Sequence, residues 1–174
     1  MTRLAMRALV GAMIAAALVP ALATSTPTPT IDVPSSAAYG TLDIPMNLAV
    51  AMGLNCNLTD TGLTCYESET EALAALDTTT NLVAAASCTP AMTLYDGASF
   101  SGASLNIATQ SVWINLSTYS FGNRTSSWRT GCVGGYLADG TGGAGTRIGM
   151  PAGGSDGSLG TFNNLASSAL RCPC

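Results

Sequence analysis

Two segments of the chain carry nearly the same sequence at a fixed spacing. The segment from Phe121 to Ser127 reads FGNRTSS, and 41 residues later the segment from Phe162 to Ser168 reads FNNLASS. Both combine an aromatic residue with a short amide and a closing pair of hydroxyls, so each is rich in small oxygen donors. A repeat of about 40 residues indicates one supersecondary unit used twice. The chain therefore predicts a small duplicated domain with two equivalent polar loops.

The start of the chain is typical of a secretory signal peptide. Two arginines precede a short apolar run that ends in an Ala-Leu-Ala cleavage site, so residues 1–23 are expected to be removed on export. The run is shorter than the roughly 20 apolar residues of a membrane span. The alternative is an uncleaved anchor. Residues 24–36, rich in Thr and Pro, predict an extended linker. We expect a secreted, extracellular protein with no membrane association after cleavage.

The chain has six cysteines, all beyond the predicted signal peptide. An even number in a short exported chain indicates disulfides, although spacing alone does not define the pairing. Zinc is disfavoured because the chain has no histidine. We favour Cys56–Cys65 as a local loop closure and Cys88–Cys132 as a bracket around the first repeat. Cys172 and Cys174 are then left with no assigned pairing.

The absence of histidine also excludes Ser-His-Asp and Cys-His catalysis. Glu67, Glu69 and Glu71 are clustered, but Ser68 and Glu71 have the spacing of a capping box before the apolar run that ends at Leu76. These carboxylates therefore predict the start of a helix. A paired-carboxylate glycosidase would need an apolar pocket to raise one pKa, and the sequence shows none. We expect a protein that is not an enzyme.

The charge pattern narrows the range of partners. Without the two arginines of the signal peptide, four arginines and no lysine stand against ten acidic residues. Nucleic-acid binding requires clusters of basic residues for the phosphates, so it is not expected. An acidic exported protein is compatible with calcium or with a basic partner.

The sequence pattern of the chain changes at Cys88. Residues 37–87 predict a small α/β accessory segment that contains a hairpin and a short helix. From residue 88 to 174, short β-rich runs at 92–95, 103–107 and 111–116 are separated by turn residues. This regular punctuation favours an antiparallel sandwich of two repeats that share one core.

The first repeat carries a further signature before its polar loop. Tyr95 is followed after four residues by Phe100, and after one more by Gly102. Together with the loops at 122–127 and 163–168, this hairpin resembles the βγ-crystallin superfamily, in the two-motif form of exported bacterial proteins. The resemblance implies an all-β Greek-key sandwich with motif one at 88–131 and motif two at 132–174. In the second hairpin, alanine and glycine stand at the two aromatic positions.

The same resemblance implies two calcium ions at the loops, held by side-chain oxygens and backbone carbonyls, which are donors that calcium prefers. Gly122 stands where the first loop would carry an amide or carboxylate. The other interpretation is structural, because Asn and Ser turn and cap backbone without any metal. Both interpretations stay open. The implied ligands are Asn123, Arg124 and Ser126 in the first loop and Asn163, Asn164, Leu165 and Ser167 in the second.

These observations predict a secreted βγ-crystallin-like protein with a structural or binding role and weak calcium binding. We expect a monomer whose partner is an unidentified protein or a cell-wall component. One alternative is a secreted peptidase inhibitor of the related Greek-key fold, in which residues 131–135 would be the segment presented to the protease. A further alternative, an exported antimicrobial or toxin-like module, rests on analogy of fold alone.

Overall fold

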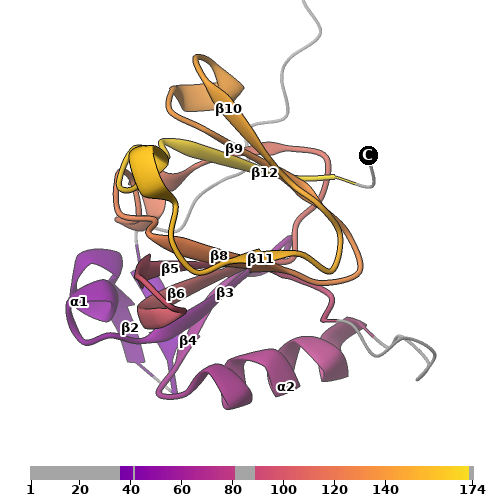
Figure 1. Cartoon of the computed structure of the whole chain (residues 1–174). Coiled ribbons are helices and arrows are strands. Elements are labelled where there is room, and N and C mark those ends of the chain that lie inside the picture. The colour runs from indigo at the N-terminus through magenta and orange to yellow at the C-terminus, as the bar shows by residue number, and fades with distance from the viewer. Residues whose placement is uncertain (1–35, 41, 81–88, 173–174) are drawn as a thin grey trace, which may run out of the picture. The chain divides into compact units, whose positions relative to one another are not determined.

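The computed structural model of the chain describes residues 36–40, 42–80 and 89–172 (Figure 1). The expected signal peptide and all but the last residue of the expected linker lie outside these ranges. Within them, no helix combines the length and the apolar character that crossing a bilayer requires.

Eight short strands lie within residues 89–172. They are β5 (Met92–Gly97), β6 (Ser101–Ile107), β7 (Trp113–Asn115), β8 (Ser127–Thr130), β9 (Gly135–Ala138), β10 (Arg147–Met150), β11 (Ser155–Asp156) and β12 (Ser168–Arg171). Three 3-10 turns lie between them, η1 (Leu116–Tyr119), η2 (Thr141–Gly143) and η3 (Gly160–Phe162).

The two motifs exchange one strand each. β7 follows β6 in the chain but pairs with β12, and β11 follows β10 but pairs with β8. The smaller sheet therefore has the order β10-β9-β12-β7, and the larger sheet contains β11-β8-β5-β6. Each sheet combines three strands of one motif with one strand of the other. The expected two-repeat Greek-key sandwich is confirmed.

The described residues between 36 and 80 extend the larger sheet. They contain β1 (Ser36–Tyr39), β2 (Leu42–Pro45), α1 (Met46–Ala51), β3 (Asn55–Thr59), β4 (Gly62–Tyr66) and α2 (Glu69–Thr80). β3 runs parallel to β6, so the larger sheet has eight strands, in the order β11-β8-β5-β6-β3-β4-β1-β2. The small α/β segment that the sequence predicted here, described over residues 36–80, is called the N-terminal segment below, and it continues the sheet of the Greek-key half.

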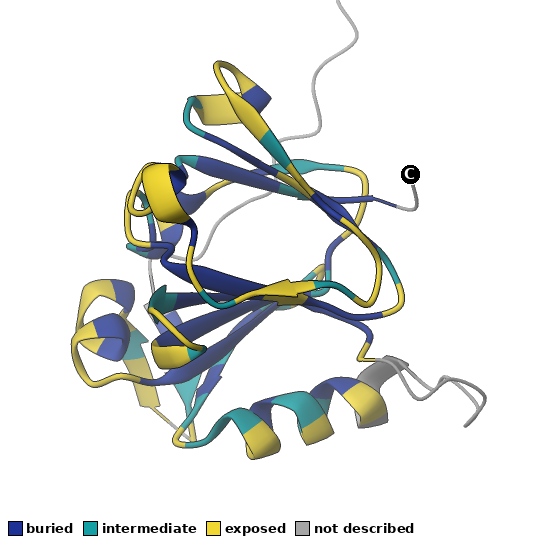
Figure 2. Ribbon diagram, in the orientation of Figure 1, coloured by how far each residue is buried: buried dark blue, intermediate teal, exposed yellow. Residues whose placement is uncertain are grey.

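Burial on both faces of the central strands explains this arrangement. In β5, Met92 and Leu94 alternate with Thr93 and Tyr95, and all four are at most 3% exposed. A strand with two buried faces must be covered on both sides. Figure 1 shows the smaller sheet on one side of the larger sheet and α2 on the other, and Figure 2 shows the buried residues running along the central strands of both sheets.

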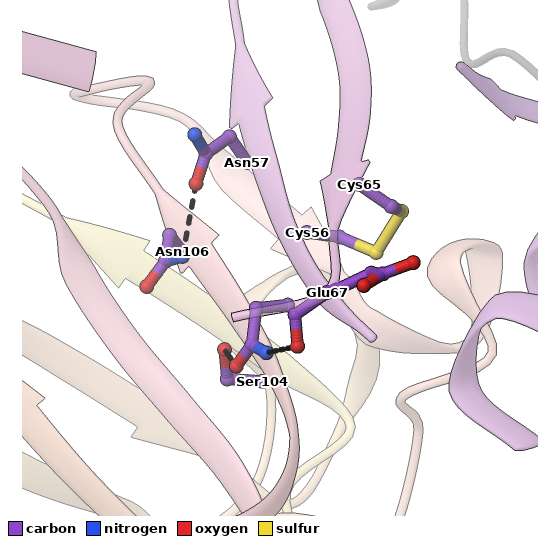
Figure 3. The surroundings of a disulfide bond; sticks show 7 residues. Cys56, Asn57, Cys65, Glu67, Ser104 and Asn106 are labelled. Carbon is purple, nitrogen blue, oxygen red and sulfur yellow. Dashed lines mark hydrogen bonds between the residues drawn. A yellow bond between two sulfur atoms is a disulfide. The ribbon is translucent and has the colours of Figure 1, made fainter. Parts of the chain in front are cut away.

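The N-terminal segment is joined to β5 and β6 by buried polar side chains, here called the asparagine seam (Asn55, Asn57, Thr93, Ser104 and Asn106). Asn106 Nδ2 donates to Asn57 Oδ1 at 2.9 Å (Figure 3). Thr93 Oγ1 donates to Asn106 Oδ1 at 2.7 Å. In a second rung, Ser104 Oγ donates to Asn55 Oδ1 at 2.8 Å. Since every one of these side chains is at most 9% exposed, their mutual hydrogen bonds offset the cost of removing them from water.

The seam also reaches the residues around α2. Asn57 Nδ2 donates to the carbonyl of Ala72 at 2.6 Å, and Asn55 Nδ2 donates to that of Glu67 at 3.3 Å. The helix begins at Glu69, as the capping box predicted, and Ser68 Oγ accepts the amide of Glu71 at 3.2 Å. The seam thereby fixes the register of β3 on β6 and the position of the helix together.

The predicted Cys56–Cys65 disulfide is formed. The two residues are directly opposite each other in the β3–β4 hairpin, with 4.0 Å between their Cα atoms (Figure 3). Cys132 and Cys172 are disulfide-bonded as well. The predicted partner of Cys132, Cys88, and the last cysteine, Cys174, lie outside the described residues.

Replacing Asn106 with alanine is expected to destabilise the protein by about 2–3 kcal/mol. The substitution leaves Thr93 Oγ1 and Asn57 Oδ1 buried without their partner, which costs about the desolvation of each group. Urea denaturation measures the loss. The matched control is Asn47→Ala on the exposed side of α1, for which we expect a change within about 0.5 kcal/mol. Equal losses in the two variants would contradict a stabilising seam.

Removing the hairpin disulfide through the double substitution Cys56→Ala and Cys65→Ala is expected to lower the free energy of unfolding by about 2–4 kcal/mol. The bond closes a loop with a sequence separation of 9, and cross-linking a loop of that size removes entropy from the unfolded chain worth about 2–3 kcal/mol. Loss of packing at two buried positions adds to this. A urea midpoint equal to that of the parent protein would contradict the expectation.

Candidate functional site

The two repeated loops adopt the same backbone conformation. Asn123 and Asn164 occupy equivalent positions and have φ values of 57° and 58°. These lie in the left-handed region, which asparagine tolerates better than most residues. Both side chains are exposed, so the loops present their amides to solvent.

A serine of each loop donates a hydrogen bond to the asparagine of the other loop. Ser126 Oγ donates to Asn164 Oδ1 at 3.2 Å, and Ser167 Oγ donates to Asn123 Oδ1 at 3.1 Å. The carbonyl of Arg124 is also 3.5 Å from Ser126 Oγ. We call the first set, with the Arg124 carbonyl, the Asn164 cluster, and the Asn123–Ser167 pair the Asn123 cluster.

The backbone repeats this exchange. The amide of Asn123 donates to the carbonyl of Ala166 at 2.8 Å, and the amide of Asn164 donates to that of Thr125 at 3.0 Å. Each asparagine is therefore held by the loop of the partner motif. The clusters can form only when both motifs are folded and paired.

The last serine of each loop has a structural role. Ser127 Oγ donates to the carbonyl of Gly97, and Ser168 Oγ donates to that of Gly140, both at 2.6 Å. Each also accepts an amide hydrogen of the hairpin, from Phe100 and Gly143 respectively, at 3.0 Å. These serines brace the folded hairpins and leave the preceding serines to the clusters.

The hairpins differ in how their aromatic space is filled. In motif one, Tyr95 and Phe100 meet edge to face with their centroids 5.7 Å apart. In motif two, Gly143 stands in the place of Phe100, and a Cβ there would lie 2.2 Å from the ring of Trp113. Trp113 of motif one therefore occupies the space that the glycine leaves, with the Arg147 guanidinium 5.0 Å from its centroid. The second hairpin keeps its fold without aromatics of its own.

The carboxylates beside the loops are engaged elsewhere. Asp96 pairs with Arg124 at 2.8 Å, and its other oxygen accepts the amide of Ala103. Asp139 accepts the amide of Thr146 at 2.7 Å. Among the residues that the structure describes, no three His, Cys, Asp or Glu side chains gather as a metal site would require. A cation at the loops would be held by amide, hydroxyl and carbonyl oxygens.

The geometry of both clusters suits a hard cation. The amide oxygen and the hydroxyl of each pair lie 3.1–3.2 Å apart, so Asn164 and Ser126 at one loop, and Asn123 and Ser167 at the other, would together hold such an ion through oxygen ligands. Thr125 Oγ1, within the first loop, is buried and has no hydrogen-bond partner in the described part of the chain. The first loop therefore has a polar group that the described part of the chain does not satisfy.

The predicted ligands are only partly brought together. Asn123, Ser126, Asn164 and Ser167 meet through their side chains, and Arg124 contributes a carbonyl. The remaining two, Asn163 and Leu165, flank Asn164 in the second loop, where both are exposed. The side chain of Arg124 turns to Asp96 instead.

The segment proposed for protease inhibition is poorly suited to that role. Of residues 131–135, three are buried glycines. The amides of Gly131 and Cys132 donate to the carbonyls of Ala91 and Thr89. The segment therefore presents few side chains to a protease cleft.

Two features together define the architecture at the site. The motifs exchange β7 and β11 between their sheets, and the loops exchange serines across the pseudo-symmetric pair of motifs. Residues 92–171 form the two-motif Greek-key sandwich that the resemblance to βγ-crystallins implies.

Solved βγ-crystallin domains match this chain in structure. The N-terminal domain of Protein S is 22% identical over 47% of this chain and 93% of its own, with a TM-score of 0.41. A βγ-crystallin from Ciona intestinalis is 18% identical over 47% and 98%, with a TM-score of 0.41. A βγ-crystallin domain from Clostridium beijerinckii is 17% identical over 48% and 99%, with a TM-score of 0.42. No family model and no curated protein matches the chain.

One set of residues beside the βγ-crystallin hairpin was not predicted. The Tyr95 hydroxyl donates to Glu69 of α2, and Arg129 lies 3.7 Å from the same carboxylate and 4.0 Å from the centroid of Phe100. The glutamates at the start of α2 were interpreted only as helix-start residues. Burial, followed by the hydrogen bond to Glu69, raises the pKa of the Tyr95 phenol above its usual value.

The raised pKa of Tyr95 predicts a loss of stability at alkaline pH. Above about pH 10 the phenol of the unfolded chain deprotonates while that of the folded protein stays protonated, so the free energy of unfolding falls by up to about 1.4 kcal/mol per pH unit. Tyr95→Phe is expected to flatten this slope between pH 9 and 11, measured by urea denaturation. Burial also raises the pKa of Tyr119, so part of the slope remains.

The matched control for this experiment is Tyr136→Phe, because Tyr136 is 39% exposed. Its slope should equal that of the parent protein. An equally steep slope in Tyr95→Phe would contradict the contribution of the buried phenol.

Proposed function

We propose that this protein is an exported, non-enzymatic βγ-crystallin-like protein that binds calcium weakly at the Asn123 and Asn164 clusters. The observation that supports the proposal is that a serine of each loop bonds to the asparagine of the other loop. This places an amide oxygen and a hydroxyl of different motifs 3.1–3.2 Å apart at two equivalent sites. Oxygen-only coordination from side chains and backbone is the environment that calcium prefers.

The donor set argues for low affinity. Both clusters consist of neutral oxygens, and the neighbouring aspartates are engaged by Arg124 and by hairpin amides. Calcium affinity rises with the number of charged ligands, so we expect dissociation constants of about 0.1–1 mM, the range of extracellular modules. Such sites are loaded where calcium is abundant, which agrees with the export that the N-terminus predicts.

Binding at these clusters would serve structure. Because each cluster joins the two motifs, an ion there stabilises their pairing and does not act within one loop. With a dissociation constant of about 1 mM, 10 mM calcium adds about 1.4 kcal/mol per site. Since the two motifs complete each other within one chain, we propose that the protein acts as a monomer.

Calcium at 10 mM is expected to raise the melting temperature of the purified protein by several degrees, and the double variant Asn123→Ala, Asn164→Ala should lose this shift. A ligand that binds only the native state must raise its stability. Differential scanning calorimetry measures the shift, and isothermal titration calorimetry measures the affinity.

The control variant is Asn115→Ala, whose side chain accepts the amide of Gly142 outside both clusters. It should keep the calcium shift of the parent protein. An unchanged melting temperature of the parent in 10 mM calcium would contradict the proposal, and so would a shift that persists in the double variant.

A further inference from the structure

The hairpin of motif one is bonded both to a cluster and to the N-terminal segment. On the cluster side, the amide of Ser126 donates to the carbonyl of Tyr95 at 2.8 Å, and Ser126 Oγ is the hydroxyl of the Asn164 cluster. On the other side, the hydroxyl of Tyr95 donates to Glu69, the first residue of α2. Tyr95 therefore connects the candidate cation site to the helix.

Further contacts make this connection stiff. Ser127, next to Ser126, holds the hairpin through Gly97 and the amide of Phe100. Arg129 lies over the ring of Phe100 and pairs with Glu69. Tyr95 is 1% exposed, so its ring cannot move without displacing its neighbours.

Motif two repeats the contacts between its hairpin and its cluster, but it has no contact that corresponds to the one between Tyr95 and α2. The amide of Ser167 donates to the carbonyl of Ala138 at 2.8 Å, as that of Ser126 does to Tyr95. Ser168 holds its hairpin as Ser127 does. Ala138, however, stands in the place of Tyr95 and has no side chain that could reach a helix. The two clusters therefore have the same loop contacts, but only the hairpin beside the Asn164 cluster is bonded to α2.

We propose that cation binding at the Asn164 cluster is coupled to docking of α2 through Tyr95, whereas binding at the Asn123 cluster is not. This inference rests on the calcium binding proposed above and assigns Tyr95 and Glu69 as positioning residues. A cation on Ser126 Oγ fixes the Ser126 backbone and, through it, the strand that presents the Tyr95 hydroxyl to Glu69. By linkage, a docked helix strengthens cation binding by the same factor. The N-terminal segment thus senses the occupancy of one of the two sites.

Single-site proteins allow each cluster to be measured alone. In full-length Asn123→Ala, only the Asn164 cluster remains, and in Asn164→Ala, only the Asn123 cluster remains. Tyr95→Phe, added to each, removes the hydroxyl that meets Glu69 and keeps the ring. Isothermal titration with calcium chloride is expected to show at least about a fivefold loss of affinity at the Asn164 cluster, the lower end of typical coupling. The affinity of the Asn123 cluster should change less than twofold.

Two further substitutions separate coupling from simple electrostatics. Glu69→Ala should weaken the Asn164 cluster as Tyr95→Phe does. Glu71→Ala removes the same charge from the same turn of the helix, where the side chain is exposed, and should leave the affinity unchanged. A similar loss in both would assign the effect to net charge and overturn the inference.

Hydrogen exchange supplies a second readout. Calcium at 10 mM should slow amide exchange in α2 when the Asn164 cluster is intact, and should not do so when only the Asn123 cluster remains. Binding heat without any effect of Tyr95→Phe or of calcium on α2 would overturn the coupling and leave the proposed function standing. No binding heat at either cluster would overturn both.

Discussion

The exchange of β7 and β11 between the two sheets is the constraint on which the rest of the structure depends. Because each sheet needs a strand from the other motif, neither motif has a complete sheet of its own. The same exchange brings the two loops side by side, so that the serine of each can reach the asparagine of the other. Architecture and candidate site are consequences of a single topological feature.

The N-terminal segment covers the polar side chains of β5 and β6 and supplies their hydrogen-bond partners. On β5 and β6, Thr93, Ser104 and Asn106 would suit contact with water, and yet all are buried. Asn55 and Asn57 of β3 meet them with matching amides. A buried polar network that is fully satisfied specifies one register more strictly than apolar packing does, because a slipped strand would leave several groups unpaired.

Much of the Greek-key half could be predicted from the sequence. The spacing of Tyr95, Phe100 and Gly102 defined the first hairpin, and the repeated loop predicted a second motif. The filling of hairpin two by Trp113 could not be predicted, because that ring arrives from a strand of the other motif. The pairing of β3 with β6 was also missed. Asn57 and Asn106 lie 49 residues apart, and the alternation of polar and apolar residues shows that a strand has two buried faces without naming its neighbour.

Because β3 pairs with β6, β6 is not an edge strand that could pair with another molecule. In the described part of the chain, its counterpart β10 is an edge strand of the smaller sheet, with one row of backbone groups unpaired by β9. β10 is only four residues long, begins with exposed Arg147, contains Gly149 and is followed by Pro151. Short length, charge and proline are the features by which natural sheets resist edge-to-edge pairing. At β6 the edge is thus covered by another strand of the same chain, and at β10 pairing with a second molecule is opposed by short length, charge and proline.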